Sequence, residues 1–575
     1  QSRLRAKSAG YGFHPGAGDP LTEEPRAEKT TSGSYAVLVI LSAAMFVYVI
    51  DTTVMNVSIS ALVEDLDTTV GGVQAAITLY TLTMASFMLT GGKLGDIWGS
   101  KKAFRIGLLI YGIGTTITAF SQSIGMLIVG WSILEGLGSA LIVPAINTLI
   151  RANYTGSRRA SAYGVLWGVA AAGAAFGPLV GGWLTTNASW RVAFAVEAVI
   201  VVAVLAFSGL LRDAPPVTPK PKLDLVGVAL SVVGLGLFVL GVLQTSSRGW
   251  SDPLVLAMIA LGLIIVAVFV WWVRRREAAG EPVLVHPSIF RHRSISAGLP
   301  VLSTQTFAQA GVLFLIPLFT QSVLGFDAFQ TGLTLLPLSI GVLVTSMTTP
   351  SLGPRIYPKY IIQSGLVLLF VGGFILARSL ETATEASDMA WGLLIGGIAI
   401  GLIAGQLPNL ILSGVEPREA SEASGLQGTA QNLGMALGTA VIGTVILTVA
   451  LSSIGTQVQA STTIADETKA AVEAAVNDGF TSADQEVLAE ELVTAPPEVQ
   501  EEVEMIYEEA ALNGFQGAIL VGGIVALLGA LVAFWLPKEK VKPESEGVEQ
   551  IVRDTVRNTT VAKLQFEMDD LPPSP

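Results

Sequence analysis

The chain has 575 residues, of which 51% are hydrophobic and 14% charged, and its mean hydropathy is +0.62. This composition excludes an ordinary soluble globular protein and indicates a membrane protein. Cysteine is absent, which excludes disulfides and thiolate chemistry, and the three histidines lie outside the apolar stretches. We therefore expect no metal site and no cofactor, and a membrane-embedded enzyme is only a remote alternative.

Fourteen apolar stretches approach the roughly 20 residues that a helix needs to cross a bilayer. A polar leader over 1–35 precedes six stretches in 36–212, two in 223–275 and six in 294–537, and a polar tail follows at 538–575. The stretches are 36–62, 70–92, 103–121, 124–150, 161–185, 190–211, 224–245, 253–273, 295–323, 328–350, 360–379, 390–413, 423–452 and 515–536. The predicted fold is an all-α membrane protein with two six-helix bundles and two extra central transmembrane helices.

Lysine and arginine gather on alternate loops between these stretches. The loops after the even-numbered stretches hold eighteen of them, and the opposite loops hold four. Because short cytoplasmic loops carry the excess of positive charge, both termini are expected in the cytoplasm and the protein in the plasma membrane. The first stretch is expected to be a retained helix, because the polar leader before it does not resemble a cleaved signal peptide.

The net charge of −12 is concentrated in one loop. Residues 453–514 hold fourteen acidic residues and a single basic one, Lys469. The orientation makes this loop extracellular. Its Ala- and Glu-rich segments, the last of them preceded by Pro496 and Pro497, predict short helices over the outer mouth. The loop either attracts cations or is a solvated acidic surface.

Two glycine-rich stretches in different halves match at an offset of 261 residues. "GVLWGVAAAGAAFGPLVGG" begins at Gly164, and "GLQGTAQNLGMALGTAVIG" begins at Gly425. Internal repeats are typical of secondary transporters, whose substrate site lies near the midplane where the halves face each other. The match indicates that the first six stretches pair with the last six.

The fifth stretch contains a stripe of small residues around a proline. Gly173, Gly177 and Gly181 recur at four-residue spacing, and Gly182 follows them. Such a stripe lets a neighbouring backbone approach closely. Pro178 removes one helical hydrogen bond and favours a bend. These features suit a moving interface, and tight packing alone is the alternative.

A polar turn after the second stretch reads "GGKLGDIWGSKK". Its conformational residues are Gly92, Gly95, Asp96, Gly99 and Lys101. The glycines give the backbone freedom, and the lysines follow the positive-inside rule. On topology alone it is a charged cytoplasmic turn.

The turn, the GxxxGPxxGG pattern from Gly173 to Gly182 and "IDTTVMN" in the first stretch together resemble the major facilitator superfamily. Within it the chain is similar to the fourteen-helix drug:proton antiporters of the EmrB/QacA type, over essentially residues 36–536. The resemblance implies the major facilitator fold, export driven by the proton gradient, and a role for Asp96 in locking the cytoplasm-closed state.

Three parts of the chain depart from that family's pattern. Ile97 follows Asp96, where the family usually has arginine. Ser132 stands where the family has an arginine tied to proton coupling, and Glu135 stands where it has glutamine. Glu197 replaces an asparagine of the sixth stretch. Proton coupling is therefore expected to depend on different residues in this chain.

Asp51, Glu135 and Glu197 are acids inside predicted spans, where a charge exposed to lipid costs about 2.5 to 3.5 kcal/mol. At 1.5 Å per residue, Asp51 and Glu135 both lie roughly 16 Å below the outer ends of their stretches, and Glu197 lies roughly 10 Å below. In the superfamily fold the first and fourth spans line the central cavity. We therefore expect Asp51 and Glu135 on facing walls of one aqueous vestibule.

Two nearby carboxyls disfavour joint ionisation, so at least one is expected to hold a proton. A site that gives up this proton when a cationic drug arrives is sufficient for antiport, with Asp51 as main carrier and Glu135 as partner. The alternative is that these acids only tie neighbouring helices together. For Glu197, Arg191 is a further candidate for simple neutralisation.

Other polar side chains are expected to line the same cavity. Thr52 and Asn56 lie close to the first acid in sequence, and Gln305 and Gln309 lie one helical turn apart in the other half. Such residues also bridge helices.

These observations predict a multidrug efflux transporter that exports amphipathic, cationic compounds across the plasma membrane in exchange for protons. Its partners are small-molecule substrates, protons and the lipid bilayer, without nucleic acid, and the chain is expected to act as a monomer. The alternative is an exporter of a lipid or an endogenous metabolite, in which the acids serve coupling only.

Overall fold

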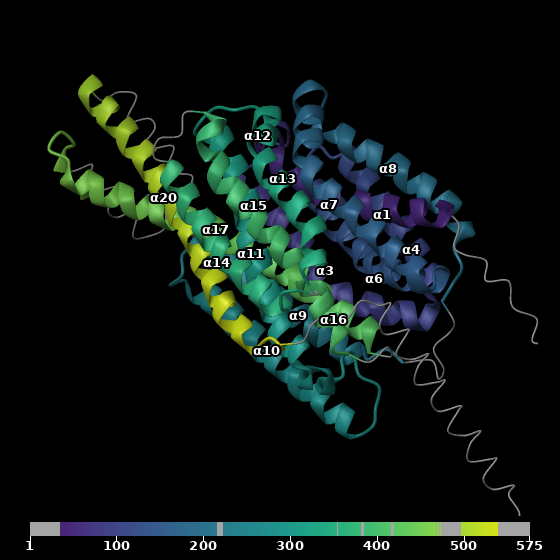
Figure 1. Cartoon of the computed structure of the whole chain (residues 1–575). Coiled ribbons are helices and arrows are strands. Elements are labelled where there is room, and N and C mark those ends of the chain that lie inside the picture. The colour runs from purple at the N-terminus through teal and green to yellow at the C-terminus, as the bar shows by residue number, and fades with distance from the viewer. Residues whose placement is uncertain are drawn as a thin grey trace, which may run out of the picture.

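The computed structural model describes residues 35–538 apart from 215–221, 354, 381–384, 416–418, 467–468, 471 and 473–495. Within these residues, long helices run side by side through the molecule (Figure 1). Every one of the fourteen predicted stretches lies largely in helix. Of the predicted leader and tail, only Tyr35 and Lys538 are described.

The N-terminal half is built from helices packed around a shared apolar core. Their bounds are α1 (Tyr35–Val57), α2 (Ile59–Asp65), α3 (Val70–Trp98), α4 (Ser100–Ala119), α5 (Ile124–Leu127), η1 (Ile128–Glu135), α6 (Gly136–Asn153), α7 (Gly156–Asn187), α8 (Trp190–Phe207) and η2 (Ser208–Leu210). The helices α5, η1 and α6 follow one another without a break and make the fourth predicted span, in which η1 is a π-helix. Leu41, Phe104 and Ile146 belong to the core between α1, α4 and α6.

Two central helices and a second bundle complete the fold. The central pair is α9 (Leu225–Arg248) and α10 (Pro253–Ala278). The second bundle comprises η3 (Pro287–Arg291), α11 (Arg293–Ser322), α12 (Ala328–Thr334), α13 (Leu336–Thr348), η4 (Thr349–Leu352), α14 (Pro358–Ser379), η5 (Ala386–Met389), α15 (Ala390–Ala404), α16 (Leu407–Ser413), α17 (Ala420–Ala460), α20 (Pro497–Val532) and η6 (Ala533–Trp535). The pair α9 and α10 pack against each other, and α9 also contacts α3 and α17.

The predicted count of fourteen spans is not confirmed. Among the described residues, twelve helices are long and apolar enough to cross a membrane, and α12 with α13, bent by 43°, would make a thirteenth. The remaining predicted span forms α4, which packs against α6 and α8. It is not among the twelve, because Lys101, Lys102 and Arg105 near its start lower its hydropathy.

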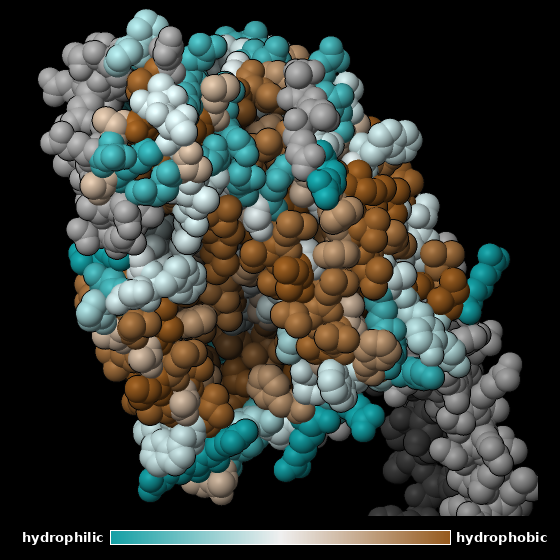
Figure 2. All heavy atoms as spheres, turned by 90° about the vertical axis from the view of Figure 1, so that its left-hand side faces the viewer, coloured by the Kyte–Doolittle hydropathy of each residue, from teal (hydrophilic) through white to brown (hydrophobic). Residues whose placement is uncertain are grey.

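The surface has an apolar band where a membrane would lie. On the face shown in Figure 2, apolar side chains fill the middle and polar side chains gather above and below them. Ile524, Leu528 and Leu531 of α20 are each more than half exposed, as are Leu263 and Ile264 of α10. Large exposed apolar side chains on long helices are stable against lipid, and this arrangement is typical of a multi-pass membrane protein.

The two halves meet along two seams. At one seam α3 packs against α17, where the Gln74 side chain donates to the carbonyl of Thr439 at 2.9 Å. At the other, α7 packs against α12 and α13. The halves also touch beyond the end of α1, where the Gln321 side chain donates to the carbonyl of Val57 at 2.9 Å and accepts from the backbone of Ser60 at 3.0 Å.

The flanks of the predicted acidic loop are longer helices than expected. Helix α17 runs on to Ala460 and α20 starts at Pro497, as the proline pair predicts, so both helices extend beyond the predicted spans. Ile454 and Val458 pack against Ile506 and join the two extensions. The short helices predicted over 473–495 lie outside the described residues.

Two histidines near the start of α11 meet the beginning of α17. His286 Nδ1 lies 2.8 Å from Glu422 Oε2, and His292 Nε2 lies 3.4 Å from Glu419 Oε2. The hydrogen bond to Glu422 raises the pKa of His286, with smaller opposing effects from burial and from Lys93 and a smaller raising effect from Glu277.

We expect the His286 pair to stabilise the protein at low pH. Because the folded-state pKa lies above the unfolded one, the contribution is complete below the unfolded pKa of about 6.5 and is lost as pH rises through the folded value. The unfolding temperature of the purified protein should fall less with rising pH in His286→Ala and Glu422→Gln than in the parent. An unchanged pH profile in both variants would contradict the prediction.

Candidate functional site

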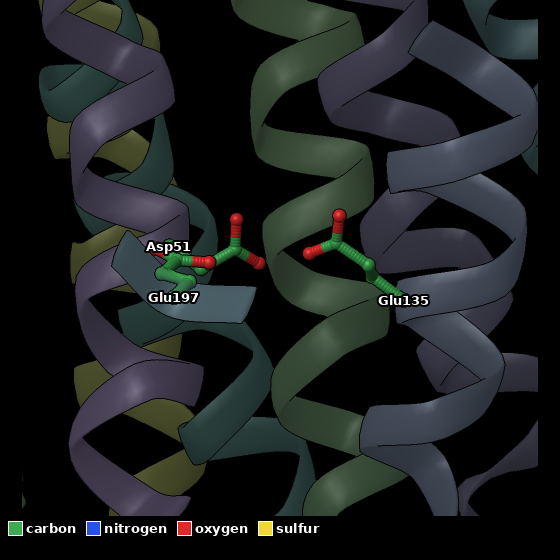
Figure 3. A group of neighbouring side chains, drawn as sticks. All are labelled: Asp51, Glu135 and Glu197. Atoms are coloured by element: carbon green, nitrogen blue, oxygen red, sulfur yellow. The ribbon is translucent and has the colours of Figure 1, made fainter. Parts of the chain in front are cut away.

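The three acids predicted inside the spans meet within the N-terminal half. Asp51 lies in the C-terminal third of α1, Glu135 ends η1, and Glu197 lies on α8. One carboxyl oxygen of each lies within 4.8 Å of the other two. Figure 3 shows the carboxyl groups converging on one gap between the helices. Residues 146 positions apart in sequence thus form one acid cluster, by which we mean these three side chains.

The structure brings the three acids together and encloses them. The expected difference in depth between Glu197 and the other two acids stays a prediction, because carboxyl oxygens that meet do not fix the depth of the backbone. The exposed fractions are 0% for Asp51 and Glu135 and 3% for Glu197. The acids are therefore enclosed among the helices of one bundle rather than displayed on the walls of an open vestibule.

Asp51 and Glu135 each accept a hydrogen bond from a neutral donor. The indole nitrogen of Trp131 donates to Asp51 Oδ1 at 2.7 Å, and the indole stacks on the ring of Tyr80 at 4.8 Å between centroids. The hydroxyl of Thr118 donates to Glu135 Oε1 at 2.9 Å. The second oxygens, Asp51 Oδ2 and Glu135 Oε2, are buried, and none of the residues that the structure describes gives them a hydrogen-bond partner.

Glu197 has a similar neutral partner and is not neutralised by Arg191. The hydroxyl of Tyr111 donates to Glu197 Oε2 at 3.3 Å. Arg191 instead pairs with Asp65, with Nη1 2.6 Å from Oδ2, and its guanidinium also donates to the backbone carbonyl of Ser121. Within the described part of the chain, no carboxyl of the cluster forms an ion pair.

A π-helix positions Glu135. Over Ile128–Glu135 the backbone winds more widely than an α-helix, a feature that often occurs at functional sites. It packs tightly on α4: a Cβ at Gly114 would lie 2.7 Å from Glu135 Cγ and 2.7 Å from the carbonyl of Gly130. Ser132, at the position of the expected arginine, donates to the backbone carbonyl of Ala76 at 2.7 Å. This position thus serves a helix contact.

The other predicted polar residues do not join the cluster. Thr52 donates to the carbonyl of Val49 and Asn56 to that of Thr52, both within α1. On α11, Gln305 donates to the side chain of Gln309 at 2.7 Å. These four side chains therefore satisfy one another or their own helix.

The glycine stripe of α7 lies against α1. A Cβ at Gly177 would approach Thr53 Oγ1 to 1.9 Å, and one at Gly181 would approach Val54 Cα to 2.9 Å. Gly173 has a looser contact, 3.4 Å from Val49 Cγ1.

The neighbouring residues of α7 face the other half of the protein. A Cβ at Gly182 would lie 2.2 Å from the carbonyl oxygen of Ala328 in α12. A Cβ at Gly332 of α12 would lie 2.5 Å from the carbonyl oxygen of Pro178. The helix continues through Pro178 without interruption. One stretch of α7 therefore contacts α1 on one side and the second bundle on the other.

The polar turn between α3 and α4 is held by η2 and the residue that follows it. Gly99 has a φ of +94°, which favours glycine, and it both ends α3 and precedes α4. Lys101 Nζ donates to the carbonyls of Gly209 and Leu211 at 2.8 and 2.7 Å. Gly92 and Gly95 lie on α3 with ordinary contacts, and the same helix carries Asp96.

Sequence reasoning missed the residues that surround the acids. Trp131, Thr118, Tyr111 and Tyr80 are all buried, and the hydroxyls of Tyr80 and Tyr111 also interact with Asp51. One signal was available: Trp131 precedes Glu135 by four residues, so both share a helix face. The other three residues lie on other helices, and hydropathy does not distinguish them.

Comparison with known proteins identifies the family. The Major Facilitator Superfamily profile matches residues 41–439. The chain belongs to this superfamily. Its fold resembles a solved bacterial homologue of the human lysosomal transporter Spinster in an inward-facing, occupied conformation, with a TM-score of 0.55 and 14% identity over 87% of this chain and 95% of that one.

Similar superfamily members include exporters of antibiotics. The chain is 30% identical to a probable actinorhodin transporter of Streptomyces coelicolor, over 74% of each chain. It is 31% identical to a cephamycin export protein of Amycolatopsis lactamdurans, over 73% of this chain and 86% of that one. It is therefore a membrane transporter of a superfamily that moves small molecules, and not an enzyme.

We expect Trp131→Phe to destabilise the acid cluster. The change keeps a ring to stack on Tyr80 but removes the indole donor to Asp51, and leaving a buried acceptor without its partner costs about 1–3 kcal/mol. Thermal unfolding should show this loss. Trp167→Phe on α7 is the matched control, because Trp167 is 46% exposed. Equal stability of the two variants would contradict the role of the indole.

Proposed function

We propose that this transporter exports amphipathic, cationic compounds across the plasma membrane in exchange for protons, with both ends of the chain in the cytoplasm. The observation that carries the proposal is the acid cluster, in which three buried carboxyls meet without a basic partner among the described residues. Relatives named for actinorhodin transport and cephamycin export support the export of small organic compounds.

Repulsion within the cluster gives a reason for it to hold protons. Two ionised carboxylates about 5 Å apart repel by about 3 kcal/mol at an effective dielectric constant of 20. A third charge at similar distances increases this cost, and protonation removes it. Such a coupled set exchanges protons as a unit rather than residue by residue.

The packing of α1 offers a route from the cluster to the interface between the halves. Asp51 lies two and three residues before Thr53 and Val54, which contact the glycine stripe of α7. The same part of α7 contacts α12 at Ala328. Charging the cluster pushes α1, η1 and α8 apart, and a shift of α1 acts directly on this seam. Proton occupancy thereby biases how the two halves meet.

The compound itself is expected to bind between the halves rather than in the cluster. The cluster is enclosed, and α1 contacts α11 across the interface. Asn56 on α1 and Gln305 and Gln309 on α11 are the polar side chains that we propose to meet the cargo. Protons and cargo then compete through the conformation of the protein and not for one carboxylate.

The test uses everted membrane vesicles with an acidic interior and a fluorescent reporter of the pH gradient. Cationic, zwitterionic and neutral compounds are added in turn to vesicles with and without the protein. We expect cationic compounds to dissipate the gradient only where the protein is present. If no compound does so while transport of labelled compound continues, proton exchange is contradicted. If only lipids or neutral metabolites move, the alternative exporter function is correct.

A further inference from the structure

The acid cluster contains two buried oxygens without a geometric hydrogen-bond partner. Among the described residues, Asp51 Oδ2 and Glu135 Oε2 accept no such bond, and both side chains are 0% exposed. Buried acceptors are normally satisfied, so two of them in one gap indicate a missing electropositive partner. Figure 3 shows these carboxyl groups turned toward each other and toward Glu197.

The remaining contacts resemble the outer shell of a metal site. Each carboxyl accepts from at least one neutral side chain, an indole for Asp51, a threonine hydroxyl for Glu135 and a tyrosine hydroxyl for Glu197. Hydrogen bonds of this kind orient ligating carboxylates and leave another oxygen for the ion.

The spacing can accommodate a cation. One oxygen of each acid lies within 4.8 Å of the other two, so there is a point within about 2.8 Å of all three oxygens. Calcium–oxygen bonds of roughly 2.3–2.6 Å fit this bound, and the flexible coordination of calcium demands less exact geometry than the octahedron of magnesium. Ligand sets made only of oxygen favour hard cations over zinc or copper.

We propose that Asp51, Glu135 and Glu197 bind a hard metal cation of about the radius of calcium, either Na⁺ or Ca²⁺. The sequence-based expectation of no metal site considered histidine and cysteine and did not foresee carboxyls from three helices. The proposal does not rest on proton exchange, because binding is an equilibrium property that requires no gradient and no transported compound.

The experiment measures equilibrium binding of radioactive sodium and, separately, radioactive calcium to the full chain in lipid nanodiscs at one fixed pH. We expect saturable binding of at least one cation at one site per chain. Asp51→Asn, Glu135→Gln and Glu197→Gln should each weaken it by roughly tenfold or more, and Thr118→Val, which keeps all three acids, by roughly tenfold. The bound cation should also raise the unfolding temperature of the parent and not that of the acid variants.

A matched control separates this site from the acidic surface. Glu508→Gln makes the same change at an exposed residue of α20 and should leave the affinity unchanged. Separate measurements with sodium and with calcium identify which ion binds. If the parent binds neither cation saturably, or if the acid variants bind as the parent does, the site does not exist. If an acid variant fails to fold, Thr118→Val tests the site instead, and unchanged affinity in that variant would contradict the proposal.

Discussion

Replacing Asp51 by asparagine is expected to lower proton-driven export by roughly tenfold or more, the scale of a coupling free energy of 1–3 kcal/mol. Asparagine keeps the shape and an acceptor for Trp131, but it neither holds nor releases a proton. Export against a gradient should therefore fail, while movement of the compound down its own gradient continues. Everted vesicles with labelled compound measure both quantities in the same preparation.

The same vesicles provide the controls for this prediction. Glu135→Gln is expected to act in the same direction, because either change removes one of the mutually repelling charges. Asp466→Asn is the matched control, since the Asp466 side chain is fully exposed and pairs only loosely with Lys469 at 3.9 Å. Undiminished export against a gradient in both Asp51→Asn and Glu135→Gln would show that the acids are structural.

Gly182→Ala is expected to reduce export and stability together. The added methyl group would lie 2.2 Å from the carbonyl oxygen of Ala328, and a backbone atom has no side-chain freedom with which to yield. Helices α7 and α12 must separate, at a cost of about 1–3 kcal/mol for overpacking. Thermal unfolding and vesicle export measure the two effects.

The same helix supplies the comparison. Gly168→Ala places the methyl group where no atom lies within 4 Å, so it should be tolerated. If Gly182→Ala behaves like Gly168→Ala, the seam between α7 and α12 is looser than its geometry indicates. Gly177→Ala tests the contact of α7 with α1 in the same way, because its methyl group would overlap Thr53.

Much of the helical architecture was predictable because hydropathy is a local property. A run of apolar residues must form a helix to satisfy its backbone in lipid, whatever its neighbours are. The glycine stripe was equally readable, since four-residue spacing places Gly177 and Gly181 on one helix face. The partners of that stripe, Thr53 and Val54 on one side and Ala328 on the other, could not be read in this way.

For the acid cluster, too, the residues could be predicted from the sequence, but their contacts could not. Hydropathy alone identified Asp51, Glu135 and Glu197 as charges in apolar runs, and counting along the helices placed two of them at one depth. The count could not show that Glu197 meets the other two acids, because a position along one helix contains no distance to another helix.

Hydropathy along the chain is enough to predict that this protein crosses a membrane and carries three acids within its spans. That these acids meet in one enclosed cluster, each with a neutral donor from another residue, follows from the packing of the helices. Helix formation depends on neighbours along the chain, whereas distances between helices depend on close packing at residues such as Gly114, which lies on a different helix from Glu135, the acid that it adjoins.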